Sequence, residues 1–393
     1  MKLLIYETTH HENLPALLDL ATDRCEQVAV FLRRLSYENI SGQGDPAQLW
    51  PGVQFVLQEE EGSNRDFIRR LFAFMRENGY THLHLATLDN NLLFFAWMIR
   101  GIRDVHISLT VHEVHEYNAN RYRDLRDWSE TLAKRYLRRR IRHYHFFLPA
   151  MVELFRQKDP RSTAVWIPSR FYTIRREQGV GSGDRPVAGS GDSFRIVIPG
   201  SVEDNRRDYG FVVAFMKELL ARREASGAML ELVLLGNGNN PYGLKIIEAL
   251  KNLGSASFQL TCYTELIPQD EYERQLAGAT ILWSPLRLEK VSLRKVPEVA
   301  GISTASGLTA DILLNNIPAL VPYGYTIPEA FRAALLPYRS KEDLAELLIR
   351  CIHDPAWYAE CRRTIAGSFA YFTKENFREA FETLMGGKAP EDR

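Results

Sequence analysis

The sequence predicts an α/β fold made of two doubly wound domains, and three observations support that prediction. Short apolar runs, typical of buried parallel strands, alternate with longer amphipathic stretches. A Gly- and Ser-rich break at residues 176–193 interrupts this alternation, and a second series of the same kind follows it. At 393 residues the chain is also longer than one ordinary hydrophobic core. We therefore expect domains at residues 1–175 and 194–393, joined by a linker or loop at 176–193.

The first series contains six strand candidates separated by helical patterns. The strands are Lys2–Tyr6, Gln27–Leu32, His82–Ala86, Ile107–Val111, His145–Leu148 and Ala164–Ile167. Apolar side chains at helical spacing predict helices over Arg65–Asn78, Asn91–Ile99 and Trp128–Arg142. Because parallel strands need long crossover connections, this alternation favours βαβ units.

The second series repeats the pattern after the break. Its predicted strands are Phe194–Gly200, Leu230–Leu235, Phe258–Cys262, Thr280–Trp283 and Ala319–Val321. Its predicted helices are Tyr209–Arg223, Tyr242–Leu253, Gln269–Ala277 and Leu308–Leu314, and consecutive helices are expected over Ser340–Met385. Two such domains would form a site at the carboxyl ends of their strands, across a cleft.

Composition narrows the class of protein. The chain has 45% apolar and 25% charged residues, and its 49 basic residues balance its 49 acidic ones, which gives no general attraction to nucleic acid. Its 4 cysteines are widely spaced and are expected to be reduced thiols. The opening residues do not resemble a signal peptide, and no apolar run is long enough for a transmembrane helix. We expect a cytoplasmic protein whose contact with the inner face of a membrane, if any, is peripheral.

The segment STASGLTADILLNNIPALVP places a Ser/Gly turn before a short helix. The start of a helix presents unpaired N–H groups and the positive end of its dipole to an anion. We expect Ser306, Gly307, Leu308 and Thr309 to contact a diphosphate. One turn further, Asp311 is expected to accept hydrogen bonds from the two hydroxyls of a ribose. An exposed Asp near a helix start is also favourable without any ligand.

Two other segments place glycines or arginines after a strand. In PGSVEDNRRDYGFVVAF, the turn at Gly200 precedes Arg206 and Arg207, and guanidinium groups donate paired hydrogen bonds to phosphate. Two solvated arginines are the alternative. In LVLLGNGNN, Gly236 and Gly238 either let the backbone approach a nucleotide or make a tight strand-to-helix turn.

A fourth segment, CYTELIPQDEYERQLAGATILWSPLR, has a loop between a strand and an acidic helix. In order, the four segments resemble those of retaining glycosyltransferases with the GT-B fold, group 1 or family 4-like. The resemblance implies two Rossmann-like domains, with Tyr263, Thr264 and Leu266 near the base of a nucleoside diphosphate sugar, UDP or GDP. A plain strand-to-helix loop is the alternative for these residues.

The resemblance also carries a departure. Many retaining members have two glutamates separated by seven residues, and the matching positions here are Ser303 and Asp311. The first carboxylate is replaced, so the position that would contact the hydroxyls of the donor sugar is uncharged here. The resemblance further implies no cofactor, no catalytic metal, and a C-terminal helix, Lys374–Met385, that crosses back to the first domain.

Catalytic candidates come from both domains. In LTVHEVHEY, His112 and Glu113 match the family's His and acidic residue beside the donor, with His115 and Glu116 as a near repeat. A cleft histidine donates hydrogen bonds and titrates near physiological pH. A surface loop is the alternative.

Positive charge is expected to oppose the charge that develops on the departing diphosphate. The candidates are Arg206 and the basic loop of Lys290, Arg294 and Lys295, of which Lys295 is the catalytic candidate. An ordinary solvated charged loop is the alternative.

The loop after the first strand, with His10, His11 and Glu12, matches the family's acceptor loop in position but lacks its glycines. The run KRYLRRRIR, Lys134–Arg142, is either a basic helix that contacts anionic lipid or a solvated helix face, with RNA binding a remote third reading.

The resemblance therefore implies a glycosyltransferase, hexosyltransferase-like, retaining and metal-independent. It would transfer a sugar to a hydroxyl of a glycan or lipid-linked acceptor, in bacterial polysaccharide or glycoconjugate synthesis. A nucleotide-sugar epimerase of the same fold and a non-catalytic nucleotide-sugar-binding subunit remain alternatives. A nicotinamide dehydrogenase is disfavoured because no GxGxxG follows the first strand.

Overall fold

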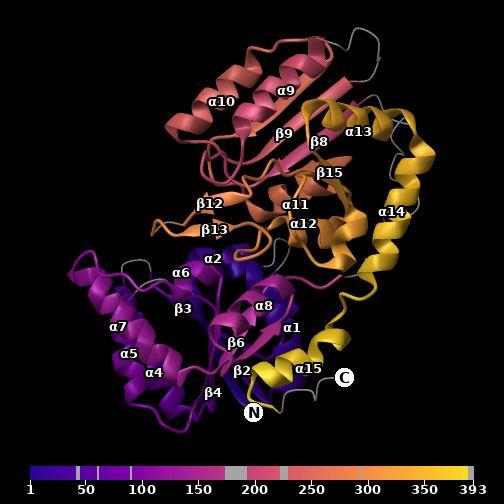
Figure 1. Ribbon diagram of the computed structural model, residues 1–393. Coiled ribbons are helices and arrows are strands. Elements are labelled where there is room, and N and C mark those ends of the chain that lie inside the picture. The colour runs from indigo at the N-terminus through magenta and orange to yellow at the C-terminus, as the bar shows by residue number, and fades with distance from the viewer. Residues whose placement is uncertain are drawn as a thin grey trace.

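The computed structural model describes residues 1–40, 45–59, 62–88, 91–172, 193–221, 229–292 and 294–387. The predicted linker, apart from Ser193, lies outside these residues. Two parallel sheets form the body of the molecule, one in each half of the chain (Figure 1). The prediction of a doubly wound α/β fold is confirmed.

The first sheet has seven parallel strands in the order β3-β2-β1-β4-β5-β6-β7. The strands are β1 (Lys2–Glu7), β2 (Gln27–Arg33), β3 (Val53–Gln58), β4 (His82–Leu85), β5 (His106–Thr110), β6 (His143–Phe146) and β7 (Thr163–Trp166). The order reverses direction at β1, whose neighbours are β2 and β4. Such a reversal opens a crevice at the carboxyl ends of the strands, where ligands bind in doubly wound folds.

Helices cover both faces of this sheet. They are α1 (Leu14–Arg24), α2 (Arg34–Asn39), α3 (Pro46–Leu49), α4 (Asn64–Glu77), α5 (Leu92–Arg100), α6 (Val114–Asn118), α7 (Leu125–Arg140) and α8 (Pro149–Lys158), with a short 3₁₀ turn, η1 (His11–Asn13). One buried cluster joins the sheet to α4, α5, α7 and α8. A second cluster joins its other face to α1.

The second sheet has six strands in the order β10-β9-β8-β11-β14-β15. They are β8 (Ser193–Pro199), β9 (Met229–Asn237), β10 (Phe258–Tyr263), β11 (Ile281–Trp283), β14 (Ala319–Pro322) and β15 (Leu335–Tyr338), and a separate antiparallel hairpin consists of β12 (Glu289–Val291) and β13 (Pro297–Val299). The helices are α9 (Tyr209–Ala221), α10 (Pro241–Lys251), α11 (Gln269–Ala277), α12 (Leu308–Asn315), η3 (Glu329–Ala334), α13 (Lys341–His353), α14 (Pro355–Phe369) and α15 (Lys374–Leu384).

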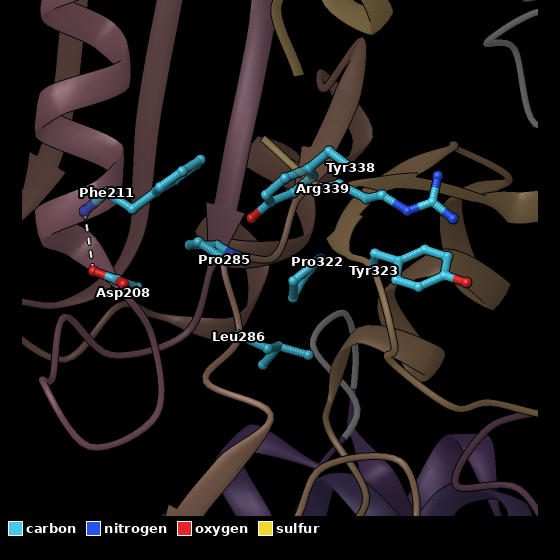
Figure 2. Close-up of a pocket in the computed structure, with 8 residues that line it drawn as sticks. All are labelled: Asp208, Phe211, Pro285, Leu286, Pro322, Tyr323, Tyr338 and Arg339. Carbon is cyan, nitrogen blue, oxygen red and sulfur yellow. Dashed lines mark hydrogen bonds between the residues drawn. The ribbon is translucent and has the colours of Figure 1, made fainter. Parts of the chain in front are cut away.

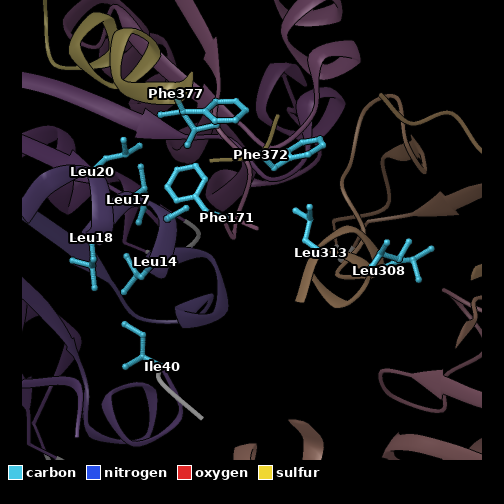
Figure 3. Close-up of a cluster of buried hydrophobic side chains, with 14 of the residues drawn as sticks. Leu14, Leu17, Leu18, Leu20, Ile40, Phe171, Leu308, Leu313, Phe372 and Phe377 are labelled. Atoms are coloured by element: carbon cyan, nitrogen blue, oxygen red, sulfur yellow. The ribbon is translucent and has the colours of Figure 1, made fainter. Parts of the chain in front are cut away.

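The last helix returns to the first sheet. Helix α15 contacts α1, β6 and β7, as the resemblance implied for the C-terminal helix. Figure 3 shows Phe171, Phe372 and Phe377 between the leucines of α1 and those of α12. The buried cluster therefore continues from one half of the molecule into the other.

Every predicted strand and helix is present, although the last two residues of the helix predicted over Tyr209–Arg223 lie outside the described residues. Among the strands, the sequence missed β3, β15 and the hairpin β12–β13, and among the helices it named no range for α1, α2, α3, α6 or α8. Strand β3 is an edge strand whose polar Gln54 is exposed, so its sequence lacks a clean apolar run. Strand β6 begins and ends earlier than predicted. His143 is polar and was not expected in a strand, but its backbone pairs with both β5 and β7. Helix α7 begins earlier than predicted because the Asp124 carboxylate accepts a hydrogen bond from Asp127 N at 2.7 Å and caps the helix.

Candidate active site between the two sheets

A buried carboxylate shapes the loop that follows β1. The Glu7 side chain is fully buried and accepts hydrogen bonds from the backbone N–H of Thr9, from His10 N at 2.6 Å, and from the Thr87 hydroxyl. Burial raises the pKa of Glu7, and these hydrogen bonds oppose that rise. Because the carboxylate bonds to two successive N–H groups, it fixes where the His10 side chain begins.

The His10 ring stacks on the His112 ring from the end of β5. The ring centroids are 4.2 Å apart and the planes differ by 28°. His112 Nε2 lies 2.9 Å from the Ala86 carbonyl oxygen, which only accepts, so Nε2 carries the proton. Burial lowers the pKa of His112 to about 3. The ring is therefore neutral near pH 7, with Nδ1 as its acceptor nitrogen.

The other acceptor-side candidates lie in the same loop. His10 Nδ1 is 3.2 Å from a Glu12 carboxylate oxygen, and His11 Nδ1 is 3.9 Å from the other oxygen of that carboxylate. The structure thus brings together His10, His11, Glu12 and His112, which the sequence had placed in two separate segments.

From the second domain, Tyr272 on α11 lies close enough to Glu12 for the charge of that carboxylate to act on its hydroxyl, and Asp311 on α12 neighbours Tyr272. The Tyr272 hydroxyl donates to Asp311 at 3.3 Å from Oδ1 and 3.4 Å from Oδ2. Burial raises the pKa of Asp311 to about 7, against the opposing effects of Tyr272, Arg207 and Arg170. The side chain expected to bind a ribose is only 8% exposed and hydrogen-bonded to a tyrosine.

Arg207 and Arg206 point in different directions. The Arg207 guanidinium packs against the backbone of Gly200, which has φ of +94°, and a Cβ there would lie 2.4 Å from Arg207 Nη2. The Arg207 Nε is buried and has no hydrogen-bond partner within the described part of the chain. By contrast, the Arg206 side chain is 57% exposed and lies 4.0 Å from Glu203. The charge of Arg207 acts on Asp311, where it opposes the rise in the pKa of the carboxyl group.

Close packing requires glycine at Gly236, near the end of β9, and favours it at Gly238, just after that strand. A Cβ on Gly236 would lie 2.2 Å from the carbonyl carbon and oxygen of Gly200. A Cβ on Gly238 would lie 2.7 Å from Ile247 Cδ1. These glycines therefore let the end of β9, the turns after β8 and β9 and helix α10 approach closely, and their contact with a nucleotide stays a prediction.

The start of α12 is arranged around Ser306. Its hydroxyl accepts from Leu308 N at 3.3 Å, and Thr309 Oγ1 donates to its carbonyl at 3.2 Å. A Cβ on Gly307 would meet no atom within 4 Å, so this glycine faces open space. The Leu308 side chain is 2% exposed and belongs to the core, and a contact of its backbone with a diphosphate stays a prediction.

The base-side candidates form an open loop. The Tyr263 hydroxyl donates to Glu271 at 2.6 Å. Thr264 and Leu266 are exposed. Their contact with a base stays a prediction.

The first position of the family's carboxylate pair is used for a contact between the domains. Ser303 is fully buried, its hydroxyl accepts from Val299 N at 2.8 Å, and its carbonyl accepts from Val114 N at 2.8 Å. Thr304 forms an antiparallel bridge with Glu113. A serine here serves the contact between the two halves of the chain.

The hairpin β12–β13 continues that contact. Lys290 Nζ lies 3.2 Å from Glu113, and Arg294 pairs with Glu130 and, at 3.3 Å, with Glu116. Two cations expected near a leaving group are thus paired with carboxylates of the first domain. Lys295 is exposed between β12 and β13, with φ of +61°.

Glu298 caps the start of α6 from across this contact. Its buried carboxylate, 1% exposed, accepts from Glu116 N at 2.6 Å and His115 N at 3.4 Å. Burial raises the pKa of Glu298. Sequence reasoning did not select Glu298, Glu7, Tyr272 or Arg170. Of these four residues, only Glu7 could have been selected from the sequence, because it is a carboxylate at the end of a buried strand.

A pocket of about 330 Å³ opens at the carboxyl ends of β11, β14 and β15 (Figure 2). Its lining residues are Asp208, Phe211, Pro285, Leu286, Pro322, Tyr323, Tyr338 and Arg339. The Arg339 guanidinium lies over the Tyr323 ring, 3.9 Å from its centroid. Leu286 pairs with Arg207 through the backbone, so the pocket adjoins the arginine segment.

The basic run on α7 is only partly exposed. Lys134 donates to the Glu116 carbonyl at 2.9 Å, Arg138 to the Tyr117 carbonyl, and Arg140 to the Ile102 carbonyl at 2.8 Å. Burial lowers the pKa of Lys134 to about 8. Half of the run therefore stabilises the first domain rather than facing outward. None of the described helices is long and apolar enough to cross a bilayer.

Known proteins were compared with this chain at the levels of sequence and structure. No family model and no curated protein sequence matches it. Solved structures do match over almost its whole length. HepE from Anabaena, in complex with UDP and glucose, has a TM-score of 0.61 and 14% identity, covering 99% of this chain and 100% of its own.

The chain has the GT-B fold. Sucrose-phosphate synthase from Thermosynechococcus elongatus is similar at a TM-score of 0.58 and 15% identity, covering 98% of both chains. UDP-GlcNAc 2-epimerase from Neisseria meningitidis, bound to UDP-GlcNAc, has a TM-score of 0.54 and 11% identity, covering 94% of this chain and 98% of its own. In this GT-B protein, Arg207 and Asp311 belong to one Rossmann-like domain, and His10 and His112 to the other.

Among the residues that the structure describes, no group of three or more His, Cys, Asp or Glu side chains could hold a metal ion.

Proposed function

We propose that this protein is a glycosyltransferase that moves a sugar from a nucleoside diphosphate sugar, with UDP as the favoured nucleotide, to a hydroxyl of a glycan or lipid-linked acceptor. Support for the nucleotide comes from the GT-B fold and from similar structures solved with UDP or UDP-GlcNAc. Support for the site comes from the residues that converge between the two domains.

One observation carries the proposal. Arg207, whose buried Nε has no hydrogen-bond partner among the described residues, lies close enough to Asp311 and Tyr272 for its charge to act on both. From the other domain, Glu12 also acts on Tyr272, and Arg170 acts on Asp311. Cationic, carboxylic and phenolic groups from both domains thus share one site, an arrangement suited to an anionic sugar donor.

The proposed reaction breaks the bond between the anomeric carbon and the diphosphate oxygen and forms a bond from that carbon to the acceptor oxygen. The acceptor's proton passes to the departing diphosphate, as in a retaining front-face displacement without a metal. Arg207 and the N–H groups at Ser306 and Gly307 would hold the leaving group, because fixed donors and cations stabilise charge that develops there. His10 and Glu12 would position the acceptor hydroxyl.

His112 suits an uncharged role in this reaction. With a pKa of about 3, its ring is an acceptor at Nδ1 rather than a cation for phosphate. Lys295 remains a candidate cation for the leaving group. Glu113 is paired with Lys290 and would act by holding the two domains in contact.

The direct test supplies UDP-glucose, UDP-GlcNAc and GDP-mannose, each with and without simple glycoside acceptors. We expect a UDP-sugar to raise the melting temperature and to be consumed faster with an acceptor, with retained anomeric configuration in the product by proton NMR. Absence of binding by every nucleotide sugar would refute the proposal.

An epimerase is the second candidate, because a UDP-GlcNAc 2-epimerase shares this fold over most of the chain. Buried ionisable side chains such as Glu7 and Asp311 are groups that could exchange protons with a sugar. UDP-GlcNAc incubated without acceptor in deuterated water separates the two. Epimerisation would incorporate deuterium and invert one carbon, whereas transfer would do neither.

A non-catalytic subunit is favoured by one feature, the buried Ser303 at the position of a family carboxylate. Such a protein would bind UDP-sugars tightly and turn over none of them, with or without acceptor.

A further inference from the structure

Helix α7 exposes one continuous stripe of side chains on its outer face. Leu125, Trp128 and Leu132 are 90%, 51% and 46% exposed, and Arg135 and Arg139 continue the stripe and are also exposed. Their spacing of three and four residues places all five on one side of the helix. The opposite side, with Ala133 and Leu137, is buried against the first sheet.

Helix α5 continues this stripe alongside. Leu93 and Trp97 are 52% and 64% exposed, and Arg100 follows one turn later, also exposed. Helices α5 and α7 pack together, and Arg140 at the end of α7 donates to the Ile102 carbonyl after the end of α5. Figure 1 shows α4, α5 and α7 side by side on one face of the first sheet. The apolar side chains of both helices therefore gather at one end and their arginines at the other.

This α5–α7 surface, formed by Leu93, Trp97, Arg100, Leu125, Trp128, Leu132, Arg135 and Arg139, differs from the rest of the described molecule. The chain has 6 tryptophans, and the two that are exposed both lie on it. Exposed apolar groups collected in one place mark an interaction site, whereas scattered ones do not.

The charges of this surface have one sign. No acidic residue occupies a position of either stripe. The two carboxylates of α7 are engaged elsewhere: Asp127 pairs with Arg123 at 2.8 Å, and Glu130 pairs with Arg126 and Arg294. The protein as a whole has a formal charge of zero, so this positive charge is a local feature.

We propose that the α5–α7 surface binds an anionic lipid bilayer, with Trp97, Trp128 and the leucines in the interface and the arginines against the headgroups. Tryptophan is favoured at membrane–water interfaces, and arginine beside it gains from the negative surface potential of anionic lipid. Both helices lie flat on the sheet that supports them, so the surface contacts the bilayer without crossing it.

Charge favours a bilayer over a second copy of this chain. Two α5–α7 surfaces in contact would cover the arginines of both copies without any carboxylate from either stripe to pair with them. A two-fold interface of that kind carries like charges that oppose association. An anionic lipid surface satisfies the arginines and the apolar side chains together.

Sedimentation with vesicles tests the proposal, with no nucleotide sugar present, so the result does not depend on the transfer reaction. The wild-type chain is expected to bind vesicles of phosphatidylcholine with phosphatidylserine, and to bind phosphatidylcholine alone much more weakly. The double variant Trp97→Ser with Trp128→Ser should lower the partition coefficient by about tenfold. Arg135→Glu with Arg139→Glu should lower it on anionic vesicles only, with an effect that shrinks in high salt.

The matched control is Arg332→Glu with Arg363→Glu, two exposed arginines of the second domain, which should bind like wild type. Melting temperatures confirm that each variant is folded. The proposal is overturned if wild type does not bind anionic vesicles or if the α5–α7 variants bind them unchanged. It is equally overturned if ultracentrifugation shows a dimer that the tryptophan variants dissociate while vesicle binding is absent.

Discussion

The Tyr272 hydroxyl lies 3.3 and 3.4 Å from the two carboxylate oxygens of Asp311, so one donor is shared by both. The two side chains come from helices α11 and α12, which contact each other. A hydroxyl shared in this way occupies the carboxylate as the paired hydroxyls of a ribose would. Donor binding at Asp311 therefore requires Tyr272 to move aside or to share the carboxylate.

The raised pKa of Asp311 predicts a pH-dependent stability. Its pKa is near 3.8 when unfolded and about 7 when folded, so between these values the folded chain binds more protons than the unfolded chain. The contribution of Asp311 to the free energy of unfolding is therefore fully present below about pH 3.8 and is lost as the pH rises through 7.

Asp311→Asn removes that titration. We expect it to raise the free energy of unfolding relative to wild type by up to about 4 kcal/mol at pH 8, and by much less at pH 5. Urea unfolding at the two pH values measures the difference. An equal effect at both would show that Asp311 titrates normally.

Arg207→Ala is expected to weaken UDP binding by about tenfold to a hundredfold, because we propose that this guanidinium makes a charge-assisted contact with phosphate. Calorimetric titration with UDP and with uridine measures the loss, which should be confined to UDP. Arg363→Ala, an exposed arginine on α14, is the control and should bind UDP like wild type. Equal loss for UDP and uridine would point to a damaged fold.

Gly236→Ala should destabilise the protein by roughly 1–3 kcal/mol, since its Cβ would overlap the carbonyl of Gly200 and force the end of β9 away from the turn after β8. Gly254→Ala is the matched control, because a Cβ there meets no atom within 4 Å. Chemical denaturation of both variants provides the comparison. Similar stabilities would mean that the end of β9 and the turn after β8 separate easily.

Phe377→Ala should cost about 3–5 kcal/mol, because this ring is 2% exposed and contacts Trp166, Phe171 and Phe372. We also expect α15 to become sensitive to limited proteolysis, since its contacts with the first domain weaken. Tyr371→Ala changes a 48% exposed neighbour and should cost far less. Retained protease resistance in Phe377→Ala would show that other contacts hold α15.

Glu298→Ala leaves two N–H groups at the start of α6 without their acceptor, and we expect a loss of roughly 2–3 kcal/mol. Glu298→Gln keeps one acceptor oxygen and should lose less. Small-angle scattering should show a larger radius of gyration for Glu298→Ala if the two domains separate. An unchanged radius together with full stability would rule out Glu298 as a determinant of the domain contact.

The sequence by itself determined the two parallel sheets and most of their helices, because apolar runs and amphipathic spacing are local properties of the chain. It also selected His10, His112, Arg207 and Asp311 from four separate segments. The sequence did not predict strand β15 or the hairpin β12–β13, since such short strands have too few residues to show a hydrophobic periodicity.

Only the tertiary structure decided how these residues are used. The adjacent arginines look alike in sequence, but the close approach to Gly200 holds Arg207 inside while Arg206 faces solvent. Likewise, Lys290 and Glu113 are 177 residues apart and meet only because the two domains pack together. Burial and long-range pairing depend on that packing, and no local pattern encodes them.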